Sequence, residues 1–184
     1  MGSSTPERGF DEELVAALPR LRAFARSLAG DAARADDLVQ ETATKALANR
    51  DKYTPGTRLE AWLVTILRNT YYSHKRKSWR EIEDGDGTIA SAVPEPSNQE
   101  ARTEVGDLMR ALAGLADEQR EALILTAAAG FSYEEAAEIC GTMVGTIKSR
   151  VARGRQQLEA ILDGEADLPP RSAAIEPAEL FNRF

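Results

Sequence analysis

Two short stretches of the chain concentrate positive charge, and their chemistry is the easiest to interpret. Residues 68–80 hold five basic side chains and residues 146–155 hold four, and neither stretch contains an acid. These residues are Arg68, Lys75, Arg76, Lys77 and Arg80 in the first stretch and Lys148, Arg150, Arg153 and Arg155 in the second. Such clusters bind polyanions because they neutralise phosphates and release counterions. One cluster is as often an ordinary solvated helix face, but two at the ends of helical segments favour a nucleic-acid partner.

The chain offers little for covalent catalysis or for metal binding. It has 184 residues, a formal net charge of −7, one cysteine (Cys140) and one histidine (His74). A single cysteine excludes an intramolecular disulfide and a zinc site built from several cysteines. A lone histidine leaves no second imidazole for a metal cluster, so we expect no enzyme, no metal and no cofactor. No apolar run approaches the about 18 residues of a membrane span, and no signal peptide is evident, so we expect a cytoplasmic protein.

Helices must position the basic clusters, because apolar residues recur at helical spacing along most of the chain. Residues 14–28 carry one apolar stripe, which Pro19 is expected to divide into a short lead-in helix and a second helix. An alanine-rich helix is predicted over about residues 31–51, and residues 53–57 read as a turn. The pattern therefore predicts an all-α fold.

The strongest apolar stripe runs from residue 59 to residue 71 and predicts a long helix whose basic end projects beyond its packed part. Residues 1–80 should thus form a unit of three or four helices. Residues 81–100 are acidic, contain glycine and proline and show no period, which predicts a flexible linker. The tail at 164–184 is expected to be disordered.

A second helical unit is predicted over residues 101–163. Ser132 and Glu135 form a capping-box pattern that should open a short helix over residues 133–139. A glycine-containing turn follows, and residues 144–161 should form the last helix. A short helix, a turn and a longer helix are the layout of a helix-turn-helix.

The last predicted helix has a polar face suited to the major groove of DNA. Its apolar Val144, Ile147 and Val151 should face inward. The outward set is Thr146, Lys148, Ser149, Ala152, Arg153 and Arg155, with Arg150 at the border. Lys and Arg on such a face bind guanine acceptors and phosphates. Gly154 costs this helix about 1 kcal/mol relative to alanine, and the sequence alone offers no reason for it.

Several segments resemble the extracytoplasmic-function (ECF) sigma factors. Three segments resemble the upstream-element-binding domain of this family: LADEQRE at 115–121, GFSYEEAA at 130–137 and VGTIKSRV at 144–151. DDLVQET at 36–42 resembles the polymerase-clamp-binding motif, and AWL at 61–63 with ILRNT at 66–70 resembles the promoter-melting helix. The resemblance covers about residues 14–162 in the family's domain order. The runs ADDLVQETATKALAN, KRKSWREIEDGDG and REALILTAAAGFSYEEAAEICG are further similar to the alphaproteobacterial general-stress-response (EcfG-type) branch.

The resemblance implies three sets of binding residues. Residues 1–80 would be sigma region 2 and residues 101–163 sigma region 4. The clamp of the largest subunit of core RNA polymerase would bind Asp36, Asp37, Gln40 and Glu41 on one side of their helix. Unpaired minus-10 bases would bind Asn69, Thr70, Tyr72 and Ser73, with Lys75, Arg76, Lys77 and Arg80 on the phosphates. The minus-35 element would bind Lys148, Ser149 and Arg153, with Thr146, Arg150 and Arg155 nearer the phosphates.

Neighbouring residues receive expectations from the same resemblance. The loop at residues 53–57 would help to form the pocket for an unpaired base. Trp62 and Tyr71 lie in the apolar stripe and are expected in the core. His74 is expected to face solvent or a phosphate.

The implied function is that of an alternative sigma factor, which binds core RNA polymerase and promoter DNA and directs initiation under the control of an anti-sigma factor. The stress-response branch would make its targets general stress genes. The alternative is a sigma-like decoy that binds an anti-sigma factor without DNA activity. Such a module would normally lack DNA-facing residues such as Asn69 and Lys148 and would be joined to a receiver domain. A conventional helix-turn-helix repressor would explain only the second unit.

Overall fold

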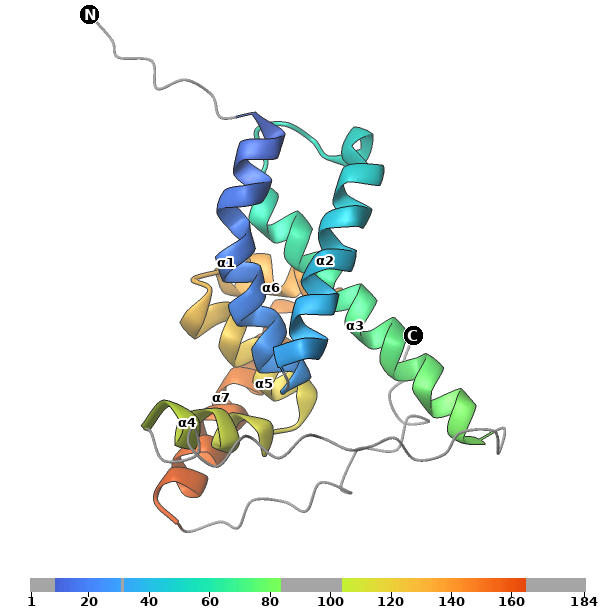
Figure 1. Ribbon diagram of the computed structural model, residues 1–184. Helices are drawn as coiled ribbons and strands as arrows, with labels where there is room; N and C mark the ends of the chain where they lie inside the picture. Colours follow the sequence, from blue (N-terminus) through green and yellow to red (C-terminus); the bar gives the residue numbers. More distant parts are fainter. Residues whose placement is uncertain (1–8, 31, 84–103, 165–184) are drawn as a thin grey trace, which may run out of the picture. The chain divides into compact units, whose positions relative to one another are not determined.

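The computed structural model describes residues 9–30, 32–83 and 104–164, and every regular element in these ranges is a helix (Figure 1). The chain divides into two units, Met1–Ala92 and Val93–Phe184. This architecture confirms the predicted all-α fold. No helix in the described ranges has the length and apolar character needed to cross a membrane.

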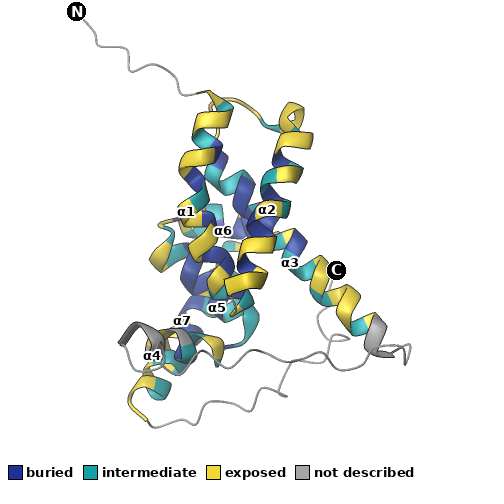
Figure 2. Ribbon diagram, in the orientation of Figure 1, coloured by how far each residue is buried: buried dark blue, intermediate teal, exposed yellow. Residues whose placement is uncertain are grey.

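The first unit packs three long helices against one another (Figure 1). They are α1 (Phe10–Ala29), α2 (Ala32–Ala48) and α3 (Leu59–Glu83), with a short 3-10 helix, η1 (Arg50–Lys52), after α2. The core is formed by the apolar side chains on their facing sides, among them Leu21, Phe24, Leu28, Leu38, Val39, Leu63, Val64 and Leu67. Figure 2 shows this burial in the packed part of α3 and exposed residues along its far end. The projecting end of the long helix is therefore confirmed.

Pro19 does not divide α1, and the predicted break there is wrong. The helix is continuous from Phe10 to Ala29 with Pro19 inside it. Pro19 cannot donate a hydrogen bond to the carbonyl of Val15, so that carbonyl must be satisfied by another donor. Both residues are exposed, and Val15 is 64% exposed. Water can therefore solvate the freed carbonyl, and the buried side of the helix continues undisturbed.

The described part of the second unit, residues 104–164, forms four helices and one π-helical turn. They are α4 (Glu104–Ala113), α5 (Asp117–Leu123), the π-helical turn η3 (Ile124–Ala128), α6 (Tyr133–Cys140) and α7 (Val144–Leu162). Its core includes Ala111, Leu115, Ala122, Leu125, Phe131, Ala136, Ile139, Cys140, Ile147 and Val151. The helix α7 packs on α4, α5 and α6, so the unit is organised around its buried face.

The short helix α6 begins as its sequence predicts. The Glu135 backbone N–H donates to Ser132 Oγ at 3.1 Å, and the Ser132 N–H donates to Glu135 Oε2 at 2.7 Å. This capping box satisfies two N–H groups that the first turn of a helix leaves without helical partners. Gly141 ends α6 with a φ of 62°, a left-handed conformation that favours glycine. Local interactions therefore define both ends of α6.

The predicted linker and tail fall mostly where the structure gives no description. Residues 84–100 of the linker and 165–184 of the tail lie outside the described residues. The first three residues assigned to the linker, 81–83, instead belong to α3, which runs through Glu83.

Candidate nucleic-acid interface

A few small and apolar residues of α7 are buried against the rest of the second unit, which leaves the opposite side of the helix accessible. Ile147, Val151 and Gly154 are buried on one side of the helix. Lys148, Ala152, Arg153 and Arg155 are exposed on the other side, and Thr146, Ser149 and Arg150 are partly exposed. The structure therefore brings all six residues expected to meet the minus-35 element to the accessible part of one helix.

Contacts within this face orient its polar groups. The Ser149 hydroxyl donates to the carbonyl of Thr146 at 2.9 Å and accepts a bond from Arg153 at 3.3 Å. The Lys148 ammonium lies 5.9 Å from the centre of the Tyr133 ring, within cation–π range. Tyr133 is the first residue of α6, so this contact joins the start of α6 to α7. The arrangement presents cations and hydroxyls together, as phosphate and base-edge recognition requires.

Gly154, which the sequence left unexplained, marks the closest approach of α7 to α5. A Cβ at this position would lie 2.8 Å from Leu123 Cδ1 and 3.3 Å from the carbonyl oxygen of Gln119. Both distances are too short for ordinary van der Waals contact, so glycine lets α7 pack closely on α5. The cost in helix propensity is offset by this packing.

Met143, the N-cap residue of α7, is 76% exposed and makes no side-chain capping bond. Serine, threonine, aspartate or asparagine would be the usual choice there, because their side chains accept bonds from the first N–H groups of the helix. The helix α7 therefore begins with an exposed apolar side chain and without a side-chain cap.

The acidic side of α2 is divided between two environments. Asp36, Asp37 and Gln40 are exposed, and Asp36 accepts a bond from Arg22 of α1 at 2.8 Å. Glu41 is only partly exposed, and its carboxylate is directed toward α3. The four residues expected to bind polymerase are thus adjacent on one helix, with Glu41 at the edge nearest α3.

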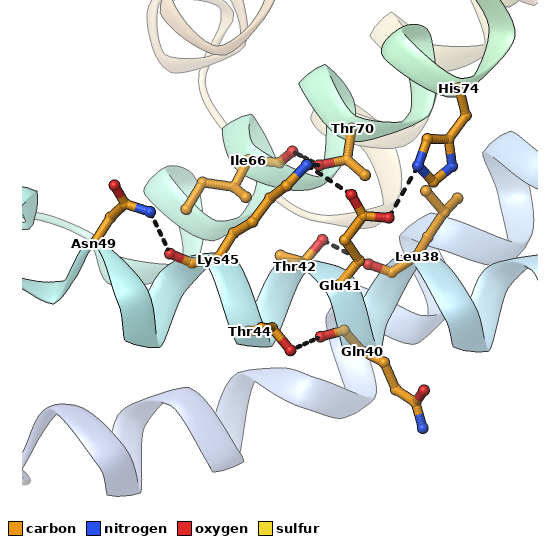
Figure 3. Close-up of polar contacts among 10 residues, drawn as sticks. All are labelled: Leu38, Gln40, Glu41, Thr42, Thr44, Lys45, Asn49, Ile66, Thr70 and His74. Atoms are coloured by element: carbon orange, nitrogen blue, oxygen red, sulfur yellow. Dashed lines mark hydrogen bonds and ion pairs between the residues drawn. The ribbon is translucent and has the colours of Figure 1, made fainter. Parts of the chain in front are cut away.

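Glu41 belongs to a polar cluster that joins α2 to α3 (Figure 3). Its Oε1 lies 2.8 Å from Lys45 Nζ, and its Oε2 lies 2.9 Å from His74 Nε2. Lys45 Nζ also donates to Thr70 Oγ1 at 2.9 Å. The hydrogen bond from Lys45 lowers the pKa of Glu41 below its ordinary 4.5, burial partly opposes this, and His74 adds to the lowering. Figure 3 shows Gln40 pointing away from this cluster.

The structure corrects the expectation for Thr70. Thr70 is 2% exposed, and its hydroxyl donates to the carbonyl of Ile66 at 2.9 Å while accepting from Lys45. Its hydroxyl is therefore used between α2 and α3 and does not reach a surface where a base binds. His74 is exposed to solvent as expected, with 54% of its side chain accessible, and its Nε2 also lies 2.9 Å from Glu41 Oε2.

The other residues expected at the minus-10 element do reach the surface of α3. Asn69 and Ser73 are exposed, and Tyr72 is partly exposed. The Tyr72 ring lies 4.8 Å from the Arg68 guanidinium and 5.2 Å from the Tyr71 ring. These two neighbours restrict the motion of the Tyr72 ring.

The basic end of α3 offers cations for a nucleic-acid backbone. Arg76, Lys77 and Arg80 are exposed and Lys75 is partly exposed. They lie beyond Thr70, the last buried residue described on this helix. Their cations therefore occupy a helical segment that projects from the packed core.

An aromatic cluster that sequence reasoning did not identify supports the loop at residues 53–57. The rings of Phe10, Tyr53 and Trp62 lie 5.6–6.3 Å apart, and the Arg50 guanidinium lies 4.9 Å from the Phe10 ring. The Tyr53 hydroxyl donates to the carbonyl of Thr57 at 2.7 Å and closes the loop. In the sequence, this cluster is indicated only by the aromatic residues on either side of the loop, Tyr53 at its start and Trp62 after its end.

Within the residues that the structure describes, no group of three or more His, Cys, Asp or Glu side chains is placed to hold a metal ion. The chain's cysteine, Cys140, is buried in the second unit. The chemistry that the described surfaces offer is binding: two basic faces, exposed amide, hydroxyl and aromatic groups, and one acidic face.

Comparison with known families gives two matches along the chain. The family described as Sigma-70 region 2 matches residues 14–81, and the family described as Sigma-70, region 4 matches residues 106–158. The first match contains α2 and most of α3, and the second contains α6 and most of α7. Each candidate face therefore lies within a matched region.

Individual relatives agree over most of the chain. The ECF RNA polymerase sigma factor EcfG of Rhodopseudomonas palustris is 55% identical over 161 residues, which are 86% of this chain and 89% of that protein. The sigma factor RpoE of Bartonella quintana, solved with the anti-sigma factor NepR, is 48% identical with a TM-score of 0.75 over 85% of this chain and 98% of that one. CnrH, solved with the cytosolic domain of CnrY, is 25% identical with a TM-score of 0.54, covering 86% of this chain and 92% of that one.

Proposed function

Because this chain belongs to the ECF branch of the sigma-70 family of RNA polymerase sigma factors, we propose that its three candidate faces divide the work of promoter recognition. Members of this family bind core RNA polymerase and promoter DNA, and they are not enzymes. Binding energy, rather than covalent chemistry, then selects and opens the promoter.

The second unit recognises the minus-35 element through α7. The observation that carries this assignment is the helix-turn-helix of α6 and α7, in which α7 buries Ile147 and Val151 and exposes Lys148 and Arg153. Lys148, Ser149 and Arg153 contact base edges, while Thr146, Arg150 and Arg155 lie nearer the phosphates. A helix of this kind fits the major groove, where base pairs are distinguished by their donors and acceptors.

The first unit captures the minus-10 element on α3. Asn69, Tyr72 and Ser73 offer amide, aromatic and hydroxyl groups to unpaired bases, and stacking contributes about 1–3 kcal/mol per base. The basic residues Lys75, Arg76, Lys77 and Arg80 hold the adjacent phosphates. Capturing a base after it leaves the duplex favours the open promoter.

The acidic side of α2 binds the clamp of the polymerase's largest subunit. Asp36, Asp37 and Gln40 are exposed side by side and suit a cationic helical partner. The turn of α3 that carries Asn69, Tyr72 and Ser73, here called the base-facing turn, belongs to the same unit as this acidic face. Polymerase binding and DNA opening therefore take place on one small domain.

The chain acts on general stress genes and is held inactive by an anti-sigma factor. The support is the similarity to EcfG and to RpoE, which is bound by NepR in its solved structure. A small anti-sigma protein that covers the DNA-binding faces would block promoter recognition by occupying their surface. We place the protein in the cytoplasm, where polymerase and DNA are present.

The test is promoter opening by the purified chain with core polymerase on a stress-type promoter. Permanganate reactivity of minus-10 thymines should appear only when both proteins are present, and a NepR-type protein should suppress it. Failure to bind core polymerase or to open any promoter, with anti-sigma binding intact, would replace this proposal with the decoy.

A further inference from the structure

The cluster of Glu41, Lys45, Thr70 and His74 is not explained by any of the three recognition faces (Figure 3). Both oxygens of the Glu41 carboxylate are engaged within the protein, one by Lys45 at 2.8 Å and the other by His74 at 2.9 Å. A carboxylate that binds two cationic or hydrogen-donating groups of its own chain has little left to offer a partner. Its neighbours Asp36, Asp37 and Gln40 are exposed on α2 and remain available to polymerase.

The cluster contacts α3 at two points on one side of the helix. Thr70 and His74 are four residues apart, so they lie one above the other. Thr70 is buried, whereas every described side chain from Tyr71 to Arg80 is partly or fully exposed. The contact between Glu41 and His74 therefore ties α3 to α2 just where apolar packing ends.

The residues of α3 that offer groups to unpaired bases lie beside these two contacts. Asn69 and Ser73 each precede a member of the cluster, and Tyr72 lies between Thr70 and His74 in the sequence. A small rotation of α3 about its axis would turn these side chains away from a bound strand. Fixing Thr70 and His74 against α2 prevents that rotation.

We propose that Glu41 is a positioning residue for promoter opening, which acts through Lys45 and His74 to hold the base-facing turn of α3. The proposal rests on the proposed function, because it assumes that this turn captures unpaired bases. It differs from the role that the sequence resemblance gave Glu41, which was direct contact with polymerase.

The experiment separates polymerase binding from base capture. Glu41→Gln removes the charge with little change in shape, and Asp37→Asn is the matched control on the exposed side of the same helix. Two affinities are measured for each chain: that for core polymerase, by titration, and that of the saturated complex for a single-stranded minus-10 oligonucleotide.

Glu41→Gln should leave the affinity for core polymerase within about twofold and weaken oligonucleotide binding by about five- to tenfold. Asp37→Asn should weaken binding to core polymerase and leave oligonucleotide binding by the saturated complex unchanged. Lys45→Met, which breaks the cluster from its other side, should reproduce the effect of Glu41→Gln. The proposal is overturned if Glu41→Gln weakens polymerase binding as much as Asp37→Asn does, or if its oligonucleotide binding is unchanged.

A spectroscopic readout distinguishes positioning from general loss of stability. His74 is the chain's one histidine, so its imidazole NMR signals report the contact with Glu41 without overlap. These signals should shift in Glu41→Gln and stay in place in Asp37→Asn. Unshifted signals in Glu41→Gln would overturn the proposal. A wild-type complex that binds no oligonucleotide would count against the proposed function itself, whereas normal wild-type binding with no difference in Glu41→Gln would defeat only this inference.

Discussion

Gly154 of α7 lies directly against Leu123 of α5, and a methyl group on Gly154 would stand 2.8 Å from Leu123 Cδ1. Leu123 is itself buried, so it cannot turn aside without disturbing its other neighbours. The pair sets how closely the recognition helix packs on the rest of the second unit. A glycine in the middle of a helix is thereby explained by tertiary packing.

Gly154→Ala should destabilise the second unit. Alanine gains up to about 1 kcal/mol in helix propensity, but overpacking of a tight core costs about 1–3 kcal/mol. We expect a net loss of about 1 kcal/mol in the free energy of unfolding. The rate at which a thiol reagent modifies buried Cys140 reports opening of this unit and should rise about fivefold.

Gly145→Ala is the matched control, because the space around a Cβ at Gly145 is empty within 4 Å. This substitution lies in the same helix and should slow labelling of Cys140. In a double-mutant cycle, Leu123→Val should relieve Gly154→Ala by about 0.5 kcal/mol or more. Strictly additive effects would show that the close contact does not determine the cost.

Met143→Ser should stabilise the second unit by supplying the missing cap of α7. A serine at the N-cap accepts a bond from a first-turn N–H and contributes about 1 kcal/mol. Labelling of Cys140 should slow about fivefold, whereas Met143→Ala, which provides no acceptor, should bring no such gain. Equal behaviour of the serine and alanine variants would mean that the cap site is already satisfied.

The stability contributed by Glu41 should depend on pH in a defined direction. Its pKa is lowered below 4.5, chiefly by the hydrogen bond from Lys45, so folding favours the ionised carboxylate. The contribution is then complete above about pH 4.5 and is lost as the pH falls through the folded-state pKa. Because the side chain is 36% exposed, we expect less than about 1 kcal/mol.

The measurement is urea unfolding of the wild type and Glu41→Gln at several pH values. Both tryptophans of the chain, Trp62 and Trp79, lie in the first unit, so their fluorescence follows that unit. The difference between the two proteins should be largest at neutral pH and shrink in acid. A difference that grows as the pH falls would contradict the account.

Local sequence rules predicted most of the helical frame. The Ser132–Glu135 capping box and the turn after α6 depend on neighbouring residues only, and both are found as expected. The break predicted at Pro19 is absent because a helix accommodates a proline where the freed carbonyl faces water. Ala127 lies three residues after Ile124, at the spacing of one α-helical face, yet it is exposed, since the π-helical turn Ile124–Ala128 changes the spacing there.

The apolar periodicity of the sequence does not predict which residues of different helices contact each other. Glu41 and His74 meet because of the register between α2 and α3, which a pattern within either helix does not specify. The burial of Thr70 and the packing of Gly154 have the same origin. Residue types indicated the basic faces of α3 and α7, and the family resemblance indicated the acidic face of α2. Neither predicted the polar cluster that links α2 to α3.

The basic end of α3 should contribute electrostatically to DNA binding. Each lysine or arginine that neutralises a phosphate adds about 0.9 to the slope of log affinity against log salt on duplex DNA. Lys77→Ala should therefore weaken binding of the polymerase complex to promoter DNA and lower that slope by about 1. Ser73→Ala, on the same exposed stretch, should leave the slope unchanged. An unaltered slope in Lys77→Ala would remove this residue from the phosphate contacts.

Promoter recognition by α7 is tested by run-off transcription with purified core polymerase and either this chain or Lys148→Ala/Arg153→Ala. We expect a promoter-dependent transcript that falls at least about tenfold in the double variant, because a good base contact contributes about 1–3 kcal/mol. On a template whose minus-35 element is scrambled, the two proteins should give equally low yields. Equal transcription by both proteins on the intact promoter, or no promoter-dependent transcript from the unaltered chain, would contradict the account.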